Sequence, residues 1–339
     1  MNIAVFTKNW IGDVIFETPA IRAIKENFPE ARLIAVTPNR CADILKVNPY
    51  IDEVIIFDEN FFSKLKLITI LRKKQIDKAF LFHRSGTRAQ MAYWGGIKER
   101  IGYDTKKRGS FLTHVVPEAE GPIHDVQYFL NLLRSAGLRV AGSNHYEFYF
   151  SESDRVRAKQ LIDEHGFEPE RLIAINPGAN WIPKRWPPAY FRELANKLIG
   201  RFNVQIILTG NPDDQAVANE ILNGETNSQI ISLCGRTTIR ELGALYSFCR
   251  FVISNDTGPL HVAAGVGADV IGIFGPTQPL ETAPLGSGKN IIVQYAHEGI
   301  ELPWIGKHFP SPWMELISVT DVFNAVEKEM FVQSNGREI

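Results

Sequence analysis

The sequence is poor in cysteine and contains no long hydrophobic run. Its three cysteines, Cys41, Cys234 and Cys249, are odd in number and widely spaced, so they indicate neither a disulfide framework nor a cysteine-based zinc site. No stretch approaches the roughly 20 apolar residues that a membrane-spanning helix needs. The N-terminus enters directly into the apolar residues 3–6, without the pattern of a secretory signal. We therefore expect a cytoplasmic protein whose contact with membranes, if it has any, is peripheral.

An excess of charge of one sign is also missing. The 37 basic and 38 acidic residues give a formal net charge of -1, which argues against the broad basic surface of a nucleic-acid-binding protein. The composition is otherwise that of an ordinary globular protein. A chain of 339 residues is longer than one hydrophobic core usually supports, so the sequence predicts two domains of roughly 150 residues each.

Several catalytic signatures are absent as well. The sequence has no Gly-x-Gly-x-x-Gly after a strand, no Gly-rich phosphate loop of the Walker type, no paired-His helix and no Gly-x-Ser-x-Gly elbow. These absences argue against a dehydrogenase, an NTPase, a metalloprotease and a hydrolase of the common types. His83, His114 and His124 lack the spacing of metal ligands, so we predict neither a metal site nor a bound cofactor.

Both halves of the chain alternate apolar strands with helical segments. In the first half we expect strands at residues 3–7, 33–37, 54–57, 79–82 and 100–103 and helices near 21–28, 43–47, 61–74 and 126–135. In the second half we expect strands at residues 172–176, 204–209, 230–233, 251–254 and 270–274 and helices near 189–202, 213–222, 239–248 and from 259. This alternation predicts an α/β fold of two Rossmann-like, doubly wound domains that face each other across a cleft.

We place these two domains at residues 1–150 and 151–320. Residues 321–339 then form a C-terminal helix and tail, and the helix at residues 322–330 could belong to either domain, including by packing back on the N-terminal one. Ligands of doubly wound sheets bind beyond the carboxyl ends of the strands. The loops that follow the strands are therefore where candidate site residues should be sought.

The most informative of these loops is a tight turn between a strand and a helix, around Gly258. Pro259 suits the first helical position, and Gly258 lets a ligand approach the main chain. The N–H groups of a helix N-terminus attract anions, so a diphosphate fits here. Asp256 and His261 flank that position and could bind sugar or ribose hydroxyls. The alternative is that Asp256 or Thr257 only caps the helix and His261 is an exposed residue of its first turn.

A carboxylate lies in the loop after the first strand, at Asp13. As a general base it could accept the proton of an acceptor hydroxyl while that oxygen attacks a sugar carbon. A following helix would lower the pKa of Asp13, and a transition state with oxocarbenium character tolerates such a weak base. The alternative is that Asp13 is a helix N-cap. The regular helix could also begin at Pro19, with Thr18 as its cap.

Two further loops belong to the second half. Lys184 and Arg185 follow a strand and could clamp the phosphates of a leaving nucleotide, or they could be a solvated pair, with Trp186 anchoring the loop. Asp214 lies in a strand-to-helix turn, where it could bind ribose hydroxyls or cap the helix. The turn at residues 274–279 would wall the pocket for the donor.

Taken together, these motifs resemble glycosyltransferase family 9, which includes the lipopolysaccharide heptosyltransferases. The resemblance rests on Gly12-Asp13 with residues 18–23, on residues 176–179 and 184–187, and on residues 255–261. It implies the GT-B fold and transfer of heptose from ADP-heptose to the lipopolysaccharide inner core, with inversion and without a metal. Residues 9–13 and 100–103 look more like the second heptosyltransferase than the first.

The resemblance also implies roles for single residues. Asp13 matches the general base, Lys184 the basic residue at the donor phosphate, and Asp214 an acidic position that faces ribose. The matches to the donor-binding turn are Asp256, Thr257, Gly258 and His261, with Pro259 between them.

In the family, the N-terminal domain binds an anionic acceptor, a glycan or glycolipid. Arg84, Arg88, Arg100 and Arg108 are the candidates here, although they could also be solvated surface charges. A lipid acceptor would bring the protein to the inner face of the cytoplasmic membrane. Many relatives carry cysteines that residues 302–312 lack.

Two other functions stay open at this stage. One is a GT-B enzyme that uses another nucleotide sugar, either a transferase for UDP-linked donors or an epimerase. The other is an inactive protein that only binds a nucleotide sugar.

Overall fold

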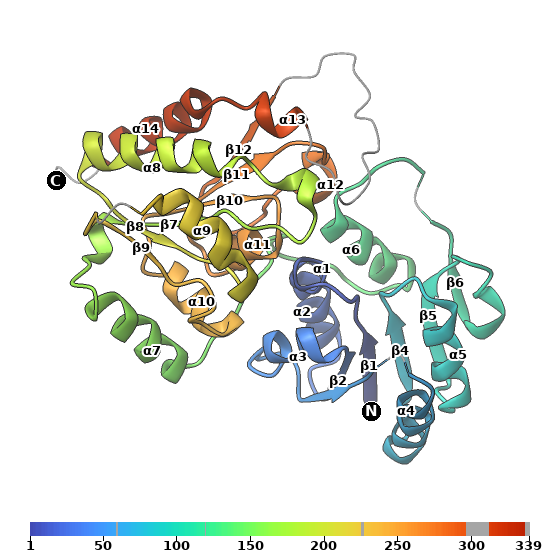
Figure 1. Ribbon diagram of the computed structural model, residues 1–339. Coiled ribbons are helices and arrows are strands. Elements are labelled where there is room, and N and C mark those ends of the chain that lie inside the picture. The colour runs from blue at the N-terminus through green and yellow to red at the C-terminus, as the bar shows by residue number, and fades with distance from the viewer. Residues whose placement is uncertain (59, 119, 225–226, 296–311, 336–339) are drawn as a thin grey trace. The chain divides into compact units, whose positions relative to one another are not determined.

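The chain folds into two compact units, Met1–Tyr149 and Phe150–Ile339. The computed structural model describes residues 1–58, 60–118, 120–224, 227–295 and 312–335, drawn as ribbon in Figure 1. Each unit contains a six-stranded parallel sheet with helices on both faces. The expected pair of doubly wound α/β units is therefore confirmed.

The first unit has the strand order β3-β2-β1-β4-β5-β6. β1 lies between β2 and β4, so the chain adds strands on one side of β1 first and then crosses to the other side. The apolar, β-branched segments expected as strands in this half of the sequence all lie in this sheet. Its strands are β1 (Asn2–Phe6), β2 (Arg32–Thr37), β3 (Glu53–Ile56), β4 (Lys78–Leu81), β5 (Glu99–Tyr103) and β6 (His114–Val116).

Helices pack on the first sheet through their apolar stripes. Leu67 and Leu71 of α4 and Met91 of α5 belong to a buried cluster with Phe6 of β1, so α4 and α5 cover one face. α2 and α6 contact each other. The helices are α1 (Ile11–Phe16), α2 (Thr18–Asn27), α3 (Asn39–Leu45), α4 (Phe61–Lys74), α5 (Gly86–Trp94) and α6 (Asp125–Ser135), with a 3₁₀ turn η1 (Gly109–Phe111).

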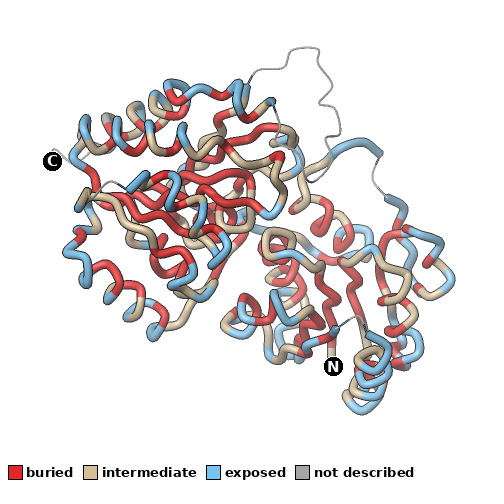
Figure 2. Tube along the Cα trace, in the orientation of Figure 1, coloured by how far each residue is buried: buried red, intermediate tan, exposed pale blue. Residues whose placement is uncertain are grey.

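The second unit repeats this plan, with the order β12-β11-β10-β7-β8-β9. β7 takes the place of β1, because β8 and β10 flank it. Most of these strands are buried along their whole length (Figure 2). They are β7 (Leu172–Asn176), β8 (Gln205–Leu208), β9 (Ile230–Ser232), β10 (Phe251–Asn255), β11 (Val270–Phe274) and β12 (Asn290–Gln294).

Helices α8, α9 and α14 share the largest buried cluster of the second unit. Val322, Val326 and Met330 of α14 pack there against α8 and the sheet, so the C-terminal helix belongs to this unit. The helices are α7 (Glu152–Asp163), α8 (Pro188–Phe202), α9 (Gln215–Leu222), α10 (Ile239–Tyr246), α11 (Gly258–Gly265), α12 (Pro279–Thr282), α13 (Pro312–Glu315) and α14 (Val319–Asn335). The 3₁₀ turns are η2 (Pro169–Arg171), η3 (Ile182–Lys184) and η4 (Pro212–Asp214).

The structure adds elements that the sequence pattern did not predict: β6, β12, α5, α7, α12 and α13. The single helix expected after the first strand is two helices, α1 and α2, which meet at Glu17. In the described residues, no helix is long and apolar enough to cross a membrane. The segment without the relatives' cysteines, residues 302–312, lies outside the described residues except for Pro312.

Candidate functional site

Each sheet has one point where the strand order reverses, and the candidate residues follow the strands at that point. In the first unit, Asp13 follows β1, and Arg84 and Arg88 follow its neighbour β4. In the second unit, Lys184 follows β7 and Asp256 follows its neighbour β10. The carboxyl ends of strands at such a reversal form the usual ligand crevice of a doubly wound sheet.

A charged group of three side chains lies at the reversal in the second unit. Lys184 Nζ is 2.6 Å from Asp256 Oδ2 and donates to the main-chain oxygen of Asp256 at 3.1 Å. His261 Nε2 is 3.6 Å from Asp256 Oδ1. The side chains of Asp256 and His261 are 3% and 4% exposed, whereas that of Lys184 is 21% exposed. The cation of this group is therefore the member that solvent or a ligand can reach.

The group keeps Asp256 ionised. Burial alone would raise the pKa of Asp256, but the contact with His261 and the positive charge of Lys184 outweigh it and lower the pKa to about 2. A buried carboxylate with two such partners holds a lysine in one place. Asp256 therefore holds Lys184 beside the turn. Asp256 is not the N-cap of the following helix, because that residue is Thr257.

The start of α11 lies next to this group. Thr257 is the N-cap residue and makes no side-chain capping hydrogen bond, and Gly258 and Pro259 are the first two helical residues. The first N–H groups of a helix have no partner within it. Pro259 has no N–H, and the Leu260 N–H donates to the Thr257 main-chain oxygen at 3.0 Å. Because no side chain caps this turn, its remaining N–H groups, beginning with that of Gly258, can bind an anion.

Asn255 and Trp186 brace the two loops, and sequence reasoning missed the role of Asn255. The Asn255 amide donates to the Pro177 main-chain oxygen at 2.8 Å and accepts from the Trp186 main-chain N–H at 3.2 Å. Trp186 is fully buried, and its indole N–H donates to the Ile317 main-chain oxygen at 2.9 Å. The only signal in the sequence is an Asn at the end of a buried strand.

Asp214 has a structural partner in its own turn. Its Oδ2 accepts the main-chain N–H of Asn211 at 3.0 Å, as part of a capping box. Burial raises the pKa of Asp214 above its ordinary value. A Cβ on Gly178 would lie 2.3 Å from Asp214 Oδ1, and one on Gly210 would lie 2.7 Å from Asp214 Cβ. Both glycines are thus needed for the carboxyl to lie between the ends of β7 and β8.

In the first unit, Asp13 is in the first turn of α1 rather than at its N-cap, which is Trp10. The Asp13 side chain is 24% exposed. Lys8 Nζ lies 3.8 Å from Asp13 and 3.9 Å from Asp125, so one ammonium is shared between two carboxylates. Asp13 is therefore a partly accessible carboxylate with a cation beside it.

Two buried charged side chains hold the loop that precedes Asp13. Glu17 accepts the main-chain N–H of Lys8 at 2.7 Å, and Arg88 donates to the Thr7 main-chain oxygen and to Asn9 Oδ1. Burial raises the pKa of Glu17 well above its ordinary value, although the bond from Lys8 opposes this. Glu17 was not singled out from the sequence, which does not reveal that it is buried.

The four arginines expected at the acceptor differ in their surroundings. Arg84 is exposed and pairs with Glu118, whereas Arg100 stacks on Tyr93, 5.2 Å from the ring centroid. Arg88 and Arg108 are each 1% exposed and donate to main-chain oxygens. Arg88 and Arg108 are therefore buried, and the alternative that they are solvated surface charges is wrong for these two residues. The role of all four arginines at an acceptor stays a prediction.

The model of glycosyltransferase family 9 (heptosyltransferase) matches residues 64–302, which is more than half of the chain. The chain belongs to glycosyltransferase family 9. Lipopolysaccharide heptosyltransferase 2 of Escherichia coli K12 is 27% identical to this family 9 chain over 309 residues, or 86% of this chain and 88% of that protein. Lipooligosaccharide heptosyltransferase 2 of Campylobacter jejuni (serotype O:2) is 28% identical over 289 residues, 84% of each chain.

Solved structures of family 9 proteins share the fold. The E. coli ADP-heptose lipopolysaccharide heptosyltransferase II structure has a TM-score of 0.82 at 24% identity and covers 98% of this chain and 100% of that chain. The family 9 glycosyltransferase of Veillonella parvula has a TM-score of 0.84 at 21% identity and covers 96% of each chain. These similarities identify the two Rossmann-like units of this family 9 protein as the GT-B fold.

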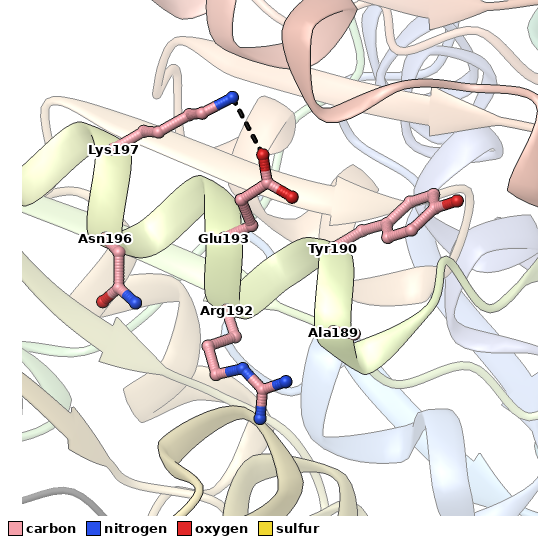
Figure 3. Close-up of a pocket in the computed structure, with 6 residues that line it drawn as sticks. All are labelled: Ala189, Tyr190, Arg192, Glu193, Asn196 and Lys197. Carbon is pink, nitrogen blue, oxygen red and sulfur yellow. Dashed lines mark ion pairs between the residues drawn. The ribbon is translucent and has the colours of Figure 1, made fainter.

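A hollow elsewhere in this family 9 protein is not a candidate for the site. A hollow of about 570 Å³ is lined by residues of α8 alone: Ala189, Tyr190, Arg192, Glu193, Asn196 and Lys197. Figure 3 shows these residues along the one helix. A single helix cannot surround a ligand, and the Lys197–Glu193 pair at 2.9 Å is a helix surface pair.

Among the residues that the structure describes, no cluster of His, Cys, Asp and Glu could hold a metal ion.

Proposed function

We propose that this protein is an inverting glycosyltransferase that moves heptose from ADP-heptose to the lipopolysaccharide inner core or a related anionic glycan. Membership of family 9 and the names of the heptosyltransferase relatives support this choice of donor and acceptor. The structural observation that carries the proposal is the Lys184–Asp256 pair beside the start of α11. In this proposal, the first domain binds the acceptor and the second binds the donor.

Lys184 and the first turn of α11 bind the donor diphosphate. When the bond from the sugar carbon to the phosphate oxygen breaks, negative charge develops on the departing ADP. A fixed ammonium and a helix N-terminus stabilise that charge, because both are already oriented before the reaction. Thr257, Gly258, Pro259 and His261 shape this turn, and Asp214 hydrogen-bonds a ribose hydroxyl with its free lone pairs.

Asp13 is the general base. It takes the proton of the acceptor hydroxyl as that oxygen forms a bond to the sugar carbon on the face opposite the departing ADP, which inverts the configuration. The ammonium of Lys8 lies 3.8 Å from Asp13. Arg84, which is exposed and follows β4, provides positive charge for an anionic acceptor. Arg88 and Arg108 are buried and Arg100 lies at the amino end of β5, so these three arginines support the domain and do not contact the acceptor. Lys184 and the helix start stabilise the charge that develops on ADP, and the proposed reaction uses no metal.

The acceptor determines where the protein works. An inner-core acceptor is linked to lipid, so we propose peripheral contact with the inner face of the cytoplasmic membrane.

The test is to incubate the purified protein with a panel of nucleotide sugars and an inner-core acceptor and to identify the nucleotide diphosphate released. ADP release from ADP-heptose, together with thermal stabilisation by ADP but not by UDP, is the expected result, since a ligand of the native state raises its apparent stability. Stabilisation by UDP alone would exclude the ADP-heptose donor. Binding of ADP-heptose without transfer or hydrolysis would indicate a protein that only binds nucleotide sugars.

A further inference from the structure

Two phenylalanines lie side by side on the surface of the first unit, at the start of α4. Phe61 is 67% exposed and Phe62 is 81% exposed, and their rings contact each other edge to face with centroids 5.8 Å apart. One turn further along, Leu65 is 48% exposed. Adjacent exposed phenylalanines are costly in water, so they mark a surface that something covers.

The buried side of α4 is fully used, which leaves this face outward. Leu67 and Leu71 are the buried residues of the helix and pack in the core of the first unit. Asn60 caps the N-terminus by accepting the main-chain N–H of Ser63 at 2.8 Å. Figure 2 shows most of α4 in the colours of exposed and intermediate residues. Phe61 and Phe62 therefore lie on the face of α4 that points away from the core.

The same helix is basic along its whole length. It contains five basic residues and no acidic one, and Lys64, Lys66 and Lys73 form no salt bridge within the part of the chain that the structure describes. Arg72 donates to the main-chain oxygen of Trp94, which is itself 48% exposed. An aromatic ring and a cation thus extend the face to the end of α5.

We propose that this face docks on an anionic lipid bilayer. We define the α4 surface as Phe61, Phe62, Leu65, Lys66, Arg72 and Lys73. Aromatic and leucine side chains on a Lys-rich helix are suited to the boundary between headgroups and acyl chains, and each nearby cation adds attraction to anionic headgroups. The charge favours a bilayer because an anionic surface can pair with Lys66, Arg72 and Lys73 together, whereas Lys74 is already paired with Glu53. This inference rests on the peripheral contact proposed above and assigns it to specific residues.

The test is co-sedimentation of the full chain with vesicles of phosphatidylcholine mixed with phosphatidylglycerol, and with vesicles of phosphatidylcholine alone. The wild type is expected to bind the mixed vesicles, and salt should weaken binding. Phe61→Ser with Phe62→Ser should reduce partitioning by roughly tenfold for each ring. Lys66→Gln and Lys73→Gln together should reduce it by roughly fivefold for each charge removed.

Matched controls come from α7, a surface helix of mixed charge. Val156→Ser removes an apolar residue that is 49% exposed, and Lys159→Gln removes a cation, so both should bind vesicles like the wild type. Unchanged thermal unfolding of all variants confirms that they are folded. Equal binding by the Phe variants, equal losses in the α7 controls, or a wild-type dimer that the Phe variants dissociate would overturn the proposal.

Release of ADP from ADP-heptose in the absence of lipid separates the two proposals. Variants of the α4 surface should release ADP at the wild-type rate. If no variant, nor the wild type, uses ADP-heptose while vesicle binding still depends on Phe61 and Phe62, the proposed reaction fails and the docking surface stands.

Discussion

The two units have the same sheet topology, but the carboxylates at their strand reversals differ in exposure. Asp13, after β1, is partly accessible and shares the ammonium of Lys8 with Asp125. Asp256, after β10, is almost completely buried and holds the ammonium of Lys184 in direct contact. The strand reversal thus carries an accessible carboxylate after β1 in the first unit, and a buried one after β10, the counterpart of β4, in the second.

The difference agrees with the roles that we propose for the two sites. A general base must exchange a proton with a substrate, so its carboxylate has to be reachable. An anion site needs a cation with little freedom of movement. Asp256, whose pKa is about 2, stays ionised at any physiological pH and holds the Lys184 ammonium in place. Substitution of Asp13 in the first unit should therefore reduce turnover, and substitution of Lys184 in the second unit should weaken donor binding.

Asp13→Asn should give the largest effect. The amide keeps the shape of the side chain but cannot take a proton, so turnover should fall by roughly 10²- to 10⁴-fold. Thermal stabilisation by ADP should be unchanged, because the second unit is intact. The measurement is the rate of ADP release with acceptor present.

Asp125→Asn is the matched control, since Asp125 contacts the same Lys8. Turnover close to that of the wild type is expected. A similar loss in both variants would mean that the charge balance around Lys8, and not proton transfer to Asp13, is what matters.

Lys184→Gln should act on the other unit. It removes the cation and leaves Asp256 with His261 alone, so affinity for ADP should fall by roughly 10- to 100-fold, the range of a hydrogen bond to a charged group. Isothermal titration with ADP measures it. Lys197→Gln on the surface of α8 is the control and should bind ADP like the wild type. Undiminished binding by Lys184→Gln would remove Lys184 from the donor site.

Much of this comparison could be predicted from the sequence, because it rests on local pattern. Buried β-branched runs such as residues 172–176 and 270–274 match the observed strands residue for residue. Short or polar elements could not be predicted in this way: β6 has three residues, and α7 buries one residue in three. The period of apolar residues is too weak a signal in such segments.

The sequence predicted which loops carry the candidate site residues, but it could not predict which of these residues contact each other. Lys184 and Asp256 are 72 residues apart, so their pairing depends on β7 and β10 being neighbours. The sequence left open whether Asp256 caps a helix, and the structure decides against it, because Thr257 is the N-cap residue of α11. Glu17 and Asn255 gave no signal, since a polar residue inside an apolar segment is not distinctive until its partners are known.

Gly178→Ala tests how tightly the end of β7 is built. The added Cβ would overlap the carboxyl of Asp214, which is fixed by Asn211, so the loop or the carboxyl must move. A loss of roughly 1–3 kcal/mol in the free energy of unfolding is expected, as for other overpacked sites. Urea unfolding measures it. Gly200→Ala in α8 meets nothing within 4 Å and should be neutral or stabilising. Equal stabilities of the two variants would contradict the crowding at Gly178.

Glu17→Gln should give the smallest effect and the one that depends most on pH. Burial raises the pKa of Glu17 above its ordinary 4.5, so the folded state retains a proton that the unfolded chain releases. The contribution of Glu17 to stability is therefore complete below pH 4.5 and declines as the pH rises towards the folded pKa. Glutamine cannot ionise, and it keeps an oxygen for the Lys8 N–H. The Tm of the variant relative to wild type should accordingly rise between pH 4 and pH 8, by roughly 2–4 °C for each kcal/mol. A constant difference across that range would show that Glu17 is ionised in the folded protein, and then its charge, like that of Asp256, would have to be balanced by a cation.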